Sequence, residues 1–322
     1  MKGIAIAGTL LVDKLNIISA YPKEGELTQI RNVSMSVGGC VPNVGIDIKK
    51  LSPCIDVLAI GKTGNDQEGS FISETLEKQG LDVSNVKVID TLGTDFTNVM
   101  SIPGGSRTFF TYSGTGKTFG ADDIDIENLK VKMLHLGYFL LLDKIDSGDG
   151  EVILKKAQEM GIRTSIDLVS ENSDRYKRVI PCLKYTDNLI INEVEAGNLT
   201  GIEPILENMP EICKALKGMG VGERVIIHAP KFGVCLSESG YVVVPSYDIP
   251  EGFIKGTTGA GDAFCAGALV GIYNGYNDKE ILEFSSAVAV CALSTVDATG
   301  GIKTIEQTKE FCKSLKRREL CL

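Results

Sequence analysis

The 322-residue sequence lacks an apolar stretch long enough to span a membrane. Its most apolar internal stretch, residues 133–142, has about half the length of a membrane span and contains His135. At the N-terminus the apolar run 3–8 is too short for a signal peptide, and Asp13 and Lys14 soon interrupt it. These absences predict a soluble cytoplasmic protein with no membrane partner.

Cysteine pairs at metal-binding spacing are also missing, although the chain contains nine cysteines. No two of them form a Cys-x-x-Cys pair, and most have apolar neighbours, as Cys265 and Cys291 do. Disulfide frameworks and zinc sites are recognised by regular cysteine spacing. The sequence therefore predicts buried free thiols in a reducing cytosol rather than disulfides or a zinc site.

An excess of positive charge is absent as well. The chain has 33 Lys and Arg against 42 Asp and Glu, which gives a formal net charge of −9. A protein-wide negative field argues against nucleic acid as a ligand. It leaves ATP open, because a phosphate group needs only a local nest of backbone N–H donors.

Three common catalytic fingerprints are missing. No Gly-x-Gly-x-x-Gly follows the first predicted strand, so the sequence does not indicate dinucleotide-dependent oxidoreduction. Segment 113–118 resembles a P-loop, but Thr111 stands where that loop needs a glycine, and a hinge is the better interpretation. The histidines, His135 and His228, lie in apolar segments without a Ser or Cys nucleophile pattern, which is typical of core histidines.

Short apolar segments that alternate with amphipathic ones are the main organisation of the chain. Such alternation predicts an α/β fold with a mostly parallel central sheet and helices on both of its faces. The expected strands are 3–8, 57–60, 132–136, 163–168, 188–191 and 224–228. The expected helices are 44–51, a helix after Asp66 that stops at Gly80, 151–160, 210–219, 262–273 and 279–294.

Two segments, approximately 11–37 and 91–112, interrupt this alternation. They contain Thr, Val, Phe and turn residues without a helical period, which predicts short antiparallel strands beside the main sheet. Each segment is too short to bury a core of its own. We therefore expect residues 1–322 to form a single domain with a small β lid.

The richest motif is the string Gly256-Thr-Thr-Gly-Ala-Gly-Asp262, which leads into a predicted helix. Small residues at 259–261 let backbone N–H groups approach a phosphate, and the start of a helix adds positive potential. Asp262 in the first turn could accept a hydroxyl proton while the loop stabilises a phosphoryl group in transfer. The alternative is an ordinary glycine-rich turn in which Asp262 complements the helix dipole.

This string is similar to the Asp-Thr-x-Gly-Ala-Gly-Asp signature of the ribokinase (pfkB) family of carbohydrate kinases. A second string, Gly38-Gly-Cys-Val-Pro-Asn43, resembles the Gly-Gly-x-x-x-Asn element of that family, and segment 60–69 is similar to its Gly-x-Asp-x-x-Gly element. The matches run in order from Asp13 to the last predicted helices. The resemblance therefore implies a ribokinase-like three-layer fold across nearly the whole chain.

The resemblance also implies roles for single residues. Asp262 is the implied catalytic base, with an anion loop formed by Gly259, Ala260 and Gly261. From the residues alone, Asp13 could be a plain turn aspartate, and Asn43 could cap a helix because Pro42 precedes it. The implied substrate-binding residues are Asp13, Gly38, Gly39, Asn43 and Arg107 in the lid. The implied ATP-binding residues are Asn192, Gly233, Thr258, Gly259 and Gly261.

Asn192 and Glu195 follow the predicted strand 188–191. Their spacing alone favours a helix N-cap with a capping box. In the resembled family this pair organises Mg²⁺ and the phosphates of ATP, largely through water, which agrees with the preference of Mg²⁺ for keeping several waters. Both roles can hold together.

Several positions depart from the family pattern. Gly256 replaces the first aspartate of the signature, which in many members helps to hold a monovalent cation, and this weakens the expectation of potassium activation. Leu11, Cys40 and Gly137 stand where ribokinases carry an asparagine, a lysine and often an acid, which argues against ribose itself. Segment 228–233 matches the family's nucleotide motif only at Gly233.

The function that the resemblance implies is an ATP- and Mg²⁺-dependent sugar kinase, with a homodimer formed through the lid. One alternative is a nucleoside kinase, in which Phe109, Phe110 and Tyr112 would clamp a base. The others are a catalytically idle regulator that binds a sugar or a nucleotide and a non-kinase Rossmann enzyme.

Overall fold

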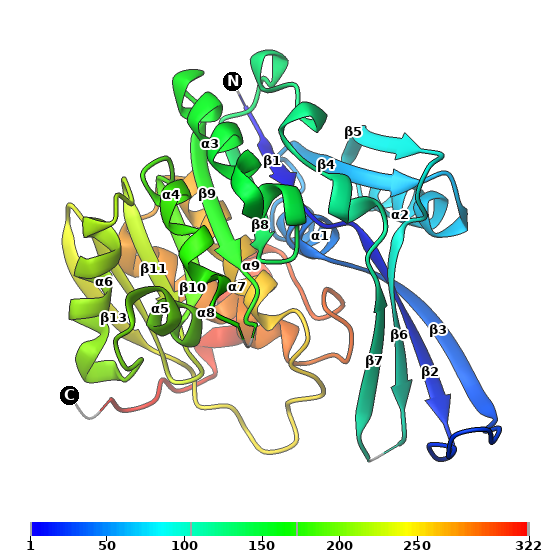
Figure 1. Ribbon diagram of the computed structural model, residues 1–322. Helices are drawn as coiled ribbons and strands as arrows, with labels where there is room; N and C mark the ends of the chain where they lie inside the picture. Colours follow the sequence, from blue (N-terminus) through cyan, green and yellow to red (C-terminus); the bar gives the residue numbers. More distant parts are fainter. Residues whose placement is uncertain (1, 104, 172, 321–322) are drawn as a thin grey trace.

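The computed structural model describes residues 2–103, 105–171 and 173–320. Its main sheet has nine strands in the order β13-β12-β11-β10-β9-β8-β1-β4-β5 (Figure 1). Neighbouring strands from β11 to β5 are parallel, whereas β12 is antiparallel to both of its neighbours. The strands are β1 (Ile4–Ala7), β4 (Val57–Gly64), β5 (Asp82–Ile89), β8 (Met133–Phe139), β9 (Arg163–Leu168), β10 (Asn188–Asn192), β11 (Arg224–His228), β12 (Phe232–Ser237) and β13 (Gly240–Pro245).

Helices cover both faces of this sheet, and each face has its own apolar core. One core is formed with α3 (Gly150–Glu159), α4 (Ile180–Leu183), α5 (Glu193–Thr200) and α6 (Met209–Gly218). The other is formed with α1 (Cys40–Leu51), α2 (Gln67–Lys78), α7 (Ala260–Tyr273) and α8 (Asp278–Ala292), against which α9 (Ile305–Lys313) packs. The predicted fold class is therefore confirmed. Among the described helices, none combines the length and the apolar character that a membrane crossing requires.

Local sequence signals set the ends of several helices. The Asp66 carboxylate accepts a hydrogen bond from the Gly69 N–H (2.8 Å) and so caps α2. The chain leaves α2 through Gly80, which has a φ of 85° that favours glycine. The expected helix after Asp66 therefore begins and stops where its capping residues indicate.

A second sheet, which we call the lid, extends from the main body (Figure 1). Its strand order is β3-β2-β6-β7. The expectation of antiparallel pairing is wrong for its central pair, because β2 and β6 are parallel. Both strands run outward from the main body, and each returns through an antiparallel partner. The lid strands are β2 (Leu11–Ile18), β3 (Ile30–Gly38), β6 (Asp95–Ser101) and β7 (Arg107–Tyr112).

Segment 113–118 returns the chain from the lid to the main body. Asp95 Oδ1 accepts hydrogen bonds from the backbone N–H groups of Gly114 and Gly116, both at 2.9 Å. These amides are used inside the protein, so this segment does not offer the phosphate cradle of a P-loop. It belongs to a set of short helical turns at Thr115–Thr118, Ala121–Asp123, Ile126–Asn128, Ile145–Asp149, Arg175–Arg178 and Leu206–Asn208.

Candidate active site

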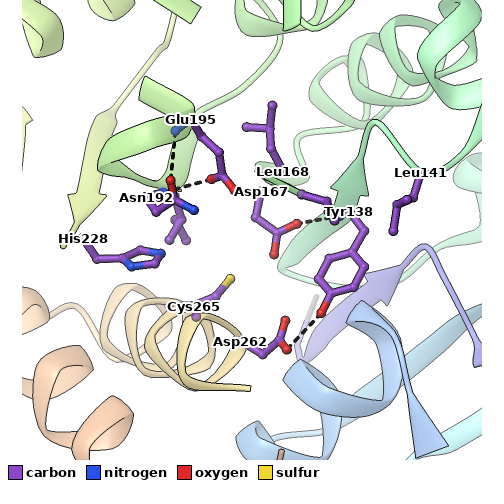
Figure 2. A pocket seen from close by; sticks show the side chains of 12 residues that line it. Tyr138, Leu141, Asp167, Leu168, Asn192, Glu195, His228, Asp262 and Cys265 are labelled. Carbon is purple, nitrogen blue, oxygen red and sulfur yellow. Dashed lines mark hydrogen bonds between the residues drawn. The ribbon is translucent and has the colours of Figure 1, made fainter. Parts of the chain in front are cut away.

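The carboxyl ends of four parallel strands meet the start of α7 around a cavity of about 270 Å³ (Figure 2). Tyr138, Asp167, Asn192 and His228 stand at the ends of β8, β9, β10 and β11. We call this space the polar cavity. Open α/β sheets bind ligands at this edge. The further lining residues are Leu141, Leu168, Val169, Ile190, Glu195, Gly261, Asp262 and Cys265.

The glycine-rich loop enters α7 through a left-handed residue. Gly259 has a φ of 79°, and an added Cβ would lie 2.6 Å from the Cα of Ala298. Any other residue would therefore be strained and would collide with the backbone. The turn lets α7 begin at Ala260, whose N–H donates to the Thr257 carbonyl oxygen (3.3 Å). Gly261 and Asp262 of the first turn line the polar cavity.

Asp262 is the third residue of α7 and is only 7% exposed. Its Oδ2 accepts hydrogen bonds from Asn43 Nδ2 (2.9 Å) and from the Tyr138 hydroxyl (3.0 Å), the second of which is drawn in Figure 2. Burial, together with the nearby carboxylate of Asp167, raises the pKa of Asp262 to about 7. Because both hydrogen bonds go to Oδ2, Oδ1 is the oxygen left for a substrate hydroxyl.

The segment at the start of α1 joins Asp13 to Asp262. The helix begins at Cys40 with Gly39 (φ 91°) as its N-cap, so the alternative that Asn43 caps the helix is wrong. Asn43 lies one turn inside and reaches Asp262 instead. An added Cβ at Gly38 would collide with the Asp13 carboxylate, whose pKa is raised by burial. The structure thus brings Asp13, Gly38, Gly39, Asn43 and Asp262 together.

Two residues of this site, Tyr138 and Asp167, were not predicted from the sequence. The Tyr138 backbone N–H donates to Asp167 Oδ1 (2.6 Å), and Tyr138 has a φ of 60°, which is rare for a residue with a side chain. Asp167 lies at the carboxyl end of a correctly predicted strand, where the ligand-edge rule could have singled it out. Tyr138 lies just beyond the predicted strand 132–136, and no sequence signal marks its conformation.

Asn192 and Glu195 form the capping box that their spacing predicted. Asn192 Oδ1 accepts a hydrogen bond from the Glu195 N–H, and Glu195 Oε2 accepts one from the Asn192 N–H, both at 2.9 Å. Ser170 Oγ donates to Glu195 Oε1 (2.8 Å). Burial raises the pKa of Glu195 to about 7, which indicates a carboxylate without a compensating charge nearby.

A second, largely apolar cavity of about 480 Å³ adjoins the polar cavity, and the two share Asn192, His228 and Gly261. Phe232 and Thr257 are among its lining residues, whereas their neighbours Gly233 and Thr258 are not. Gly233 is buried, with the side chains of Leu282 and Phe264 over it. The predicted residues Gly233 and Thr258 are therefore each one position away from the residue that lines this cavity, Phe232 and Thr257 respectively.

His228 lies between the two cavities, so its interpretation as a plain core histidine needs correction. Its ring packs on Phe264 with the ring centres 4.7 Å apart. Burial lowers the pKa of His228 to about 4, so the imidazole is neutral at physiological pH. His135, in contrast, is fully buried, as expected.

Arg107 is not brought to this site. It is exposed and pairs with Ser101, which in turn pairs with Ile17 of β2. Asp13 pairs with Thr97, four residues nearer the main body, which corresponds to about 13 Å along the strand. The lid must therefore bend, or the substrate must be long, if Arg107 is to contact it.

Comparisons with known proteins identify the family of this chain. Residues 5–305 match the model of the pfkB family of carbohydrate kinases. A ribokinase from Arabidopsis thaliana is 24% identical over 316 residues, which cover 97% of this chain and 81% of that protein. A 5-dehydro-2-deoxygluconokinase from Clostridium perfringens is 23% identical over 306 residues, which cover 90% of this chain and 88% of that protein.

A solved structure of Arabidopsis thaliana ribokinase, complexed with ribose and ATP, has a similar fold. It superposes with a TM-score of 0.83 at 22% identity and covers 97% of this chain and 99% of that one. At this level of identity the structural likeness establishes the ribokinase-like fold and leaves the substrate open.

Proposed function

The chain belongs to the pfkB family of carbohydrate kinases, and from this premise we propose that it transfers the γ-phosphoryl group of ATP to a hydroxyl of a sugar-like substrate, with Asp262 as the general base. The observation that carries the proposal is the position of Asp262. A buried carboxyl with a pKa of about 7 stands in the first turn of a helix, and one of its oxygens is free to accept a proton. A general base works best when its pKa lies near the operating pH.

The neighbours of Asp262 divide the chemistry between them. Asn43 and Tyr138 hold Oδ2 and so orient Oδ1 toward the substrate hydroxyl. In this proposal the N–H groups of the anion loop at Gly259, Ala260 and Gly261 and the positive end of α7 stabilise the charge on the phosphoryl group in transfer, and the Ala260 N–H exchanges the Thr257 carbonyl oxygen for the phosphoryl oxygen. Proton removal and charge stabilisation therefore act at one end of one helix.

The residues of the polar cavity fit a magnesium–nucleotide complex. The carboxylates of Asp167, Glu195 and Asp262 line it, and no Lys or Arg is found among its described lining residues. Oxygen donors of this kind suit Mg²⁺, which we expect Asn192 and Glu195 to hold through water. When bound, Mg²⁺ neutralises charge on the phosphate oxygens.

The adjoining apolar cavity is the place we propose for the adenine ring of ATP. Phe232, Thr257 and neutral His228 line it, and Gly261 connects it to the anion loop. We propose no monovalent cation at position 256, because an added Cβ at Gly256 would lie 3.0–3.2 Å from the backbone of Thr295 and Val296. An acid there would require that backbone to shift.

Asp13 and the start of α1 are the proposed sugar-binding wall. A carboxylate can accept hydrogen bonds from neighbouring hydroxyls, and Gly38 leaves room for it. Leu11 and Cys40 offer few partners to a polyol, so a substrate with fewer hydroxyls on this side fits better. A deoxy sugar acid, of the kind named for the clostridial relative, is our first candidate.

A nucleoside substrate is the second candidate, because one lid aromatic lies on the same face as Asp13. Phe109 pairs with Val99, and Val99 pairs with Leu15, two residues beyond Asp13 on the same face of β2. Phe109 is 62% exposed and could stack on a base. Phe110 and Tyr112 alternate to the opposite face, so they cannot complete the clamp.

A coupled assay of ADP release tests the proposal. Mg-ATP would be offered with sugars, keto-deoxy acids, sugar phosphates and nucleosides in turn. We expect substrate-dependent ADP release with one member of the sugar or sugar-acid group. Turnover with nucleosides would favour the second candidate, and substrate binding without turnover would identify an idle regulator. No turnover with any of them would contradict the kinase proposal.

A further inference from the structure

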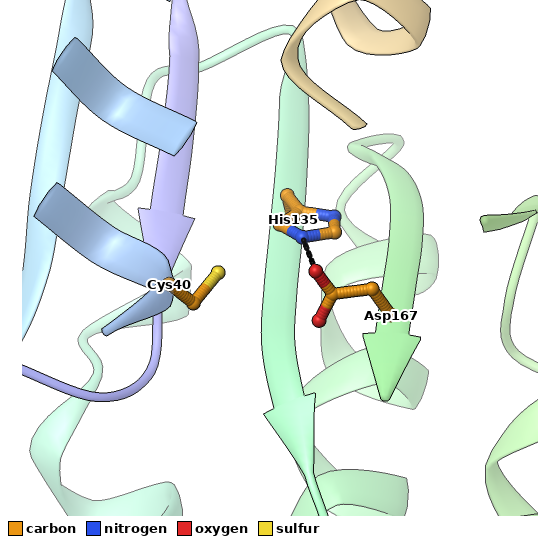
Figure 3. A group of neighbouring side chains, drawn as sticks. All are labelled: Cys40, His135 and Asp167. Carbon is orange, nitrogen blue, oxygen red and sulfur yellow. Dashed lines mark ion pairs between the residues drawn. The ribbon is translucent and has the colours of Figure 1, made fainter. Parts of the chain in front are cut away.

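Four side chains that can bind a metal, each from a different element, lie beside the polar cavity, and two of them, Asp167 and Cys265, line it. They are Cys40 at the start of α1, His135 in β8, Asp167 in β9 and Cys265 in α7. All four are buried, and the ligand atoms of Cys40, His135 and Asp167 lie within 4.8 Å of one another. Figure 3 shows the Cys40 thiol pointing toward the imidazole of His135, which faces the Asp167 carboxylate. We call these four residues the thiol cluster.

Two distances from His135 in the thiol cluster match edges of a tetrahedral metal site. His135 Nε2 lies 3.4 Å from Asp167 Oδ2 and 3.6 Å from Cys265 Sγ. With zinc bonds of about 2.0–2.1 Å to N and O and about 2.3 Å to S, the edges of a tetrahedron are about 3.3 Å for N–O and about 3.6 Å for N–S. These two edges are present without any movement of the side chains. The Cys40 sulfur lies within 4.8 Å of the His135 and Asp167 ligand atoms and has to move closer to bind the same metal.

Hydrogen bonds outside the thiol cluster hold its ligands in a binding orientation. His135 Nδ1 is 3.0 Å from Ser165 Oγ, whose hydroxyl donates to the Leu134 carbonyl oxygen at 3.5 Å. In the tautomer with its proton on Nδ1, His135 donates to Ser165 Oγ, and the lone pair of Nε2, the atom that faces Asp167 and Cys265, is available to a metal. Asp167 is fixed in turn by the Tyr138 N–H (2.6 Å). Such partners are typical of metal-bound histidine and carboxylate.

Space for the first ligand comes from a glycine. An added Cβ at Gly137 would overlap the Cys40 sulfur and would lie 3.1 Å from Asp167 Oδ1. The Cys40 thiol thus occupies the space that a side chain at position 137 would need. Nothing larger than glycine at 137 leaves the thiol cluster intact.

We propose that Cys40, His135, Asp167 and Cys265 bind a thiophilic divalent cation of the Zn²⁺ class. Two thiols and an imidazole select Zn²⁺, Cd²⁺ or Co²⁺ over Mg²⁺, which prefers oxygen ligands only. On binding, each thiol releases its proton to solvent and the thiolate sulfur donates to the metal. The thiol and imidazole donors therefore distinguish this site from the proposed magnesium site at Asn192 and Glu195, although the Asp167 carboxylate also lines the polar cavity.

Occupancy of the thiol cluster would reach Asp262 through a short connection. Asp167 Oδ1 accepts from the Tyr138 N–H, and the Tyr138 hydroxyl donates to Asp262 Oδ2. A metal bound to Asp167 and Cys265 would shift two residues that line the polar cavity, where we propose that the phosphoryl group is transferred. We therefore expect Zn²⁺ to inhibit turnover, an expectation that rests on the proposed kinase function, whereas binding itself does not.

Titration with Co²⁺, followed by absorption, tests the binding. The background protein carries Cys54→Ser and Cys321→Ser, because Cys54 is exposed and Cys321 lies outside the described residues. We expect one equivalent of Co²⁺ to give thiolate charge-transfer bands and the visible bands of tetrahedral Co²⁺. Cys40→Ser or Cys265→Ser should weaken both and lower the affinity at least about 10-fold.

Cys213→Ser is the matched control, since Cys213 is a buried free thiol in α6, outside the thiol cluster. Its spectrum should equal that of the background protein. Absence of the bands in the folded background protein would overturn the proposal, as would bands that persist unchanged in both cluster variants. The Co²⁺ absorption bands are measured on the background protein itself, so the test holds even if a cluster variant fails to fold.

A second measurement separates this proposal from the kinase proposal. With an active substrate and excess Mg-ATP, Zn²⁺ should inhibit the background protein and Cys213→Ser, with recovery on addition of a chelator. Measured relative to its own rate without Zn²⁺, because Cys40 also lies in the proposed sugar-binding wall, Cys40→Ser should resist the same Zn²⁺ concentration. Equal fractional inhibition of Cys40→Ser would contradict the regulatory role. If no substrate is turned over, the kinase proposal fails, while the Co²⁺ spectra still decide the metal site.

Discussion

At the scale of single residues, the site depends on carboxyl groups that the protein does not neutralise. Burial raises the pKa values of both Asp262 and Glu195 to about 7, and neither has a basic side chain among the described lining residues of the polar cavity. Such groups are unfavourable for folding, because burial disfavours their charged form. Their presence at a strand edge beside an anion loop is typical of a functional site.

The pKa of Asp262 predicts the pH dependence of turnover. Only the deprotonated carboxylate can accept the substrate proton, so kcat/KM should rise with pH and level off above about pH 7. Below that value we expect a loss of about tenfold per pH unit. Initial rates at saturating Mg-ATP check this, and a flat profile from about pH 5.5 to 8 would exclude a base with the pKa of Asp262.

Asp47 predicts a pH-dependent stability effect. It is fully buried in α1, one turn after Asn43, and neither carboxylate oxygen has a hydrogen-bond partner among the described residues. Burial raises its folded-state pKa well above the ordinary value, so folding is penalised increasingly as pH rises above the unfolded pKa, and not below it. Asp47→Asn should therefore increase the free energy of unfolding by about 1–3 kcal/mol near pH 8.

Urea unfolding at two pH values checks this prediction. The gain from Asp47→Asn should shrink toward zero as the pH falls to about 3, because the aspartate is then largely protonated in both states. A gain of equal size at both pH values would show that packing, rather than ionisation, is responsible.

At the scale of elements, the loop before α7 can be tested with a matched pair of glycines. Gly259 and Gly201 have similar left-handed φ values of 79° and 73°, but an added Cβ meets Ala298 at Gly259 and nothing within 4 Å at Gly201. Gly201→Ala should cost stability alone, about 1 kcal/mol. Gly259→Ala should in addition lower kcat about 100-fold or more, because the loop N–H groups move.

Steady-state kinetics and thermal unfolding of both variants check this prediction. If Gly259→Ala and Gly201→Ala lose the same small amount of activity, the loop has no special role in stabilising the transferred group.

Elements differed in how well the sequence predicted them, for physical reasons. The interior strands β9 (Arg163–Leu168) and β11 (Arg224–His228) are largely buried and were predicted with their observed bounds. In β11 the signal is the apolar run 225–227, whereas β9 mixes polar and apolar residues. In β5 (Asp82–Ile89) polar and apolar residues mix at the sheet edge, and its burial pattern shows no fully buried residue, so it was missed. The parallel pairing of β2 and β6 depends on where both strands leave the main body, which local sequence does not encode.

The candidate site follows the same division. Asp13, Asn43 and Asp262 belong to contiguous strings and could be singled out from sequence, as could the anion loop. Tyr138 and Asp167 join the site through strand ends and an unusual backbone angle. The four residues of the thiol cluster are spread from position 40 to position 265, so cysteine spacing could not indicate them.

At the scale of the whole molecule, the lid has an apolar face directed away from Asp13. Met35 pairs with Lys14, which lies in register through Asn98 with Phe110, so these residues share the face opposite Asp13. Val33, Met35 and Phe110 on this face are 59%, 48% and 57% exposed. An exposed apolar patch of this kind suits a protein–protein contact, and we propose a homodimer formed through the lid.

Light scattering after size-exclusion chromatography tests the dimer. We expect the unmodified chain to be dimeric and the double variant Met35→Glu with Phe110→Glu to be monomeric. Val152→Glu is the control, since Val152 of α3 is 45% exposed on another surface, and it should remain dimeric. If the unmodified chain is monomeric at assay concentrations, the proposed homodimer is contradicted.

The measurement that bears most directly on the proposed function is the turnover of Asp262→Asn with the substrate that the ADP-release screen identifies. The amide keeps the shape of the side chain and removes its ability to accept a proton. We predict that kcat falls by at least about 100-fold, while the KM for ATP changes little, because general-base catalysis typically contributes 10²–10⁴-fold. A kcat within about tenfold of the unmodified enzyme would show that Asp262 is not the base.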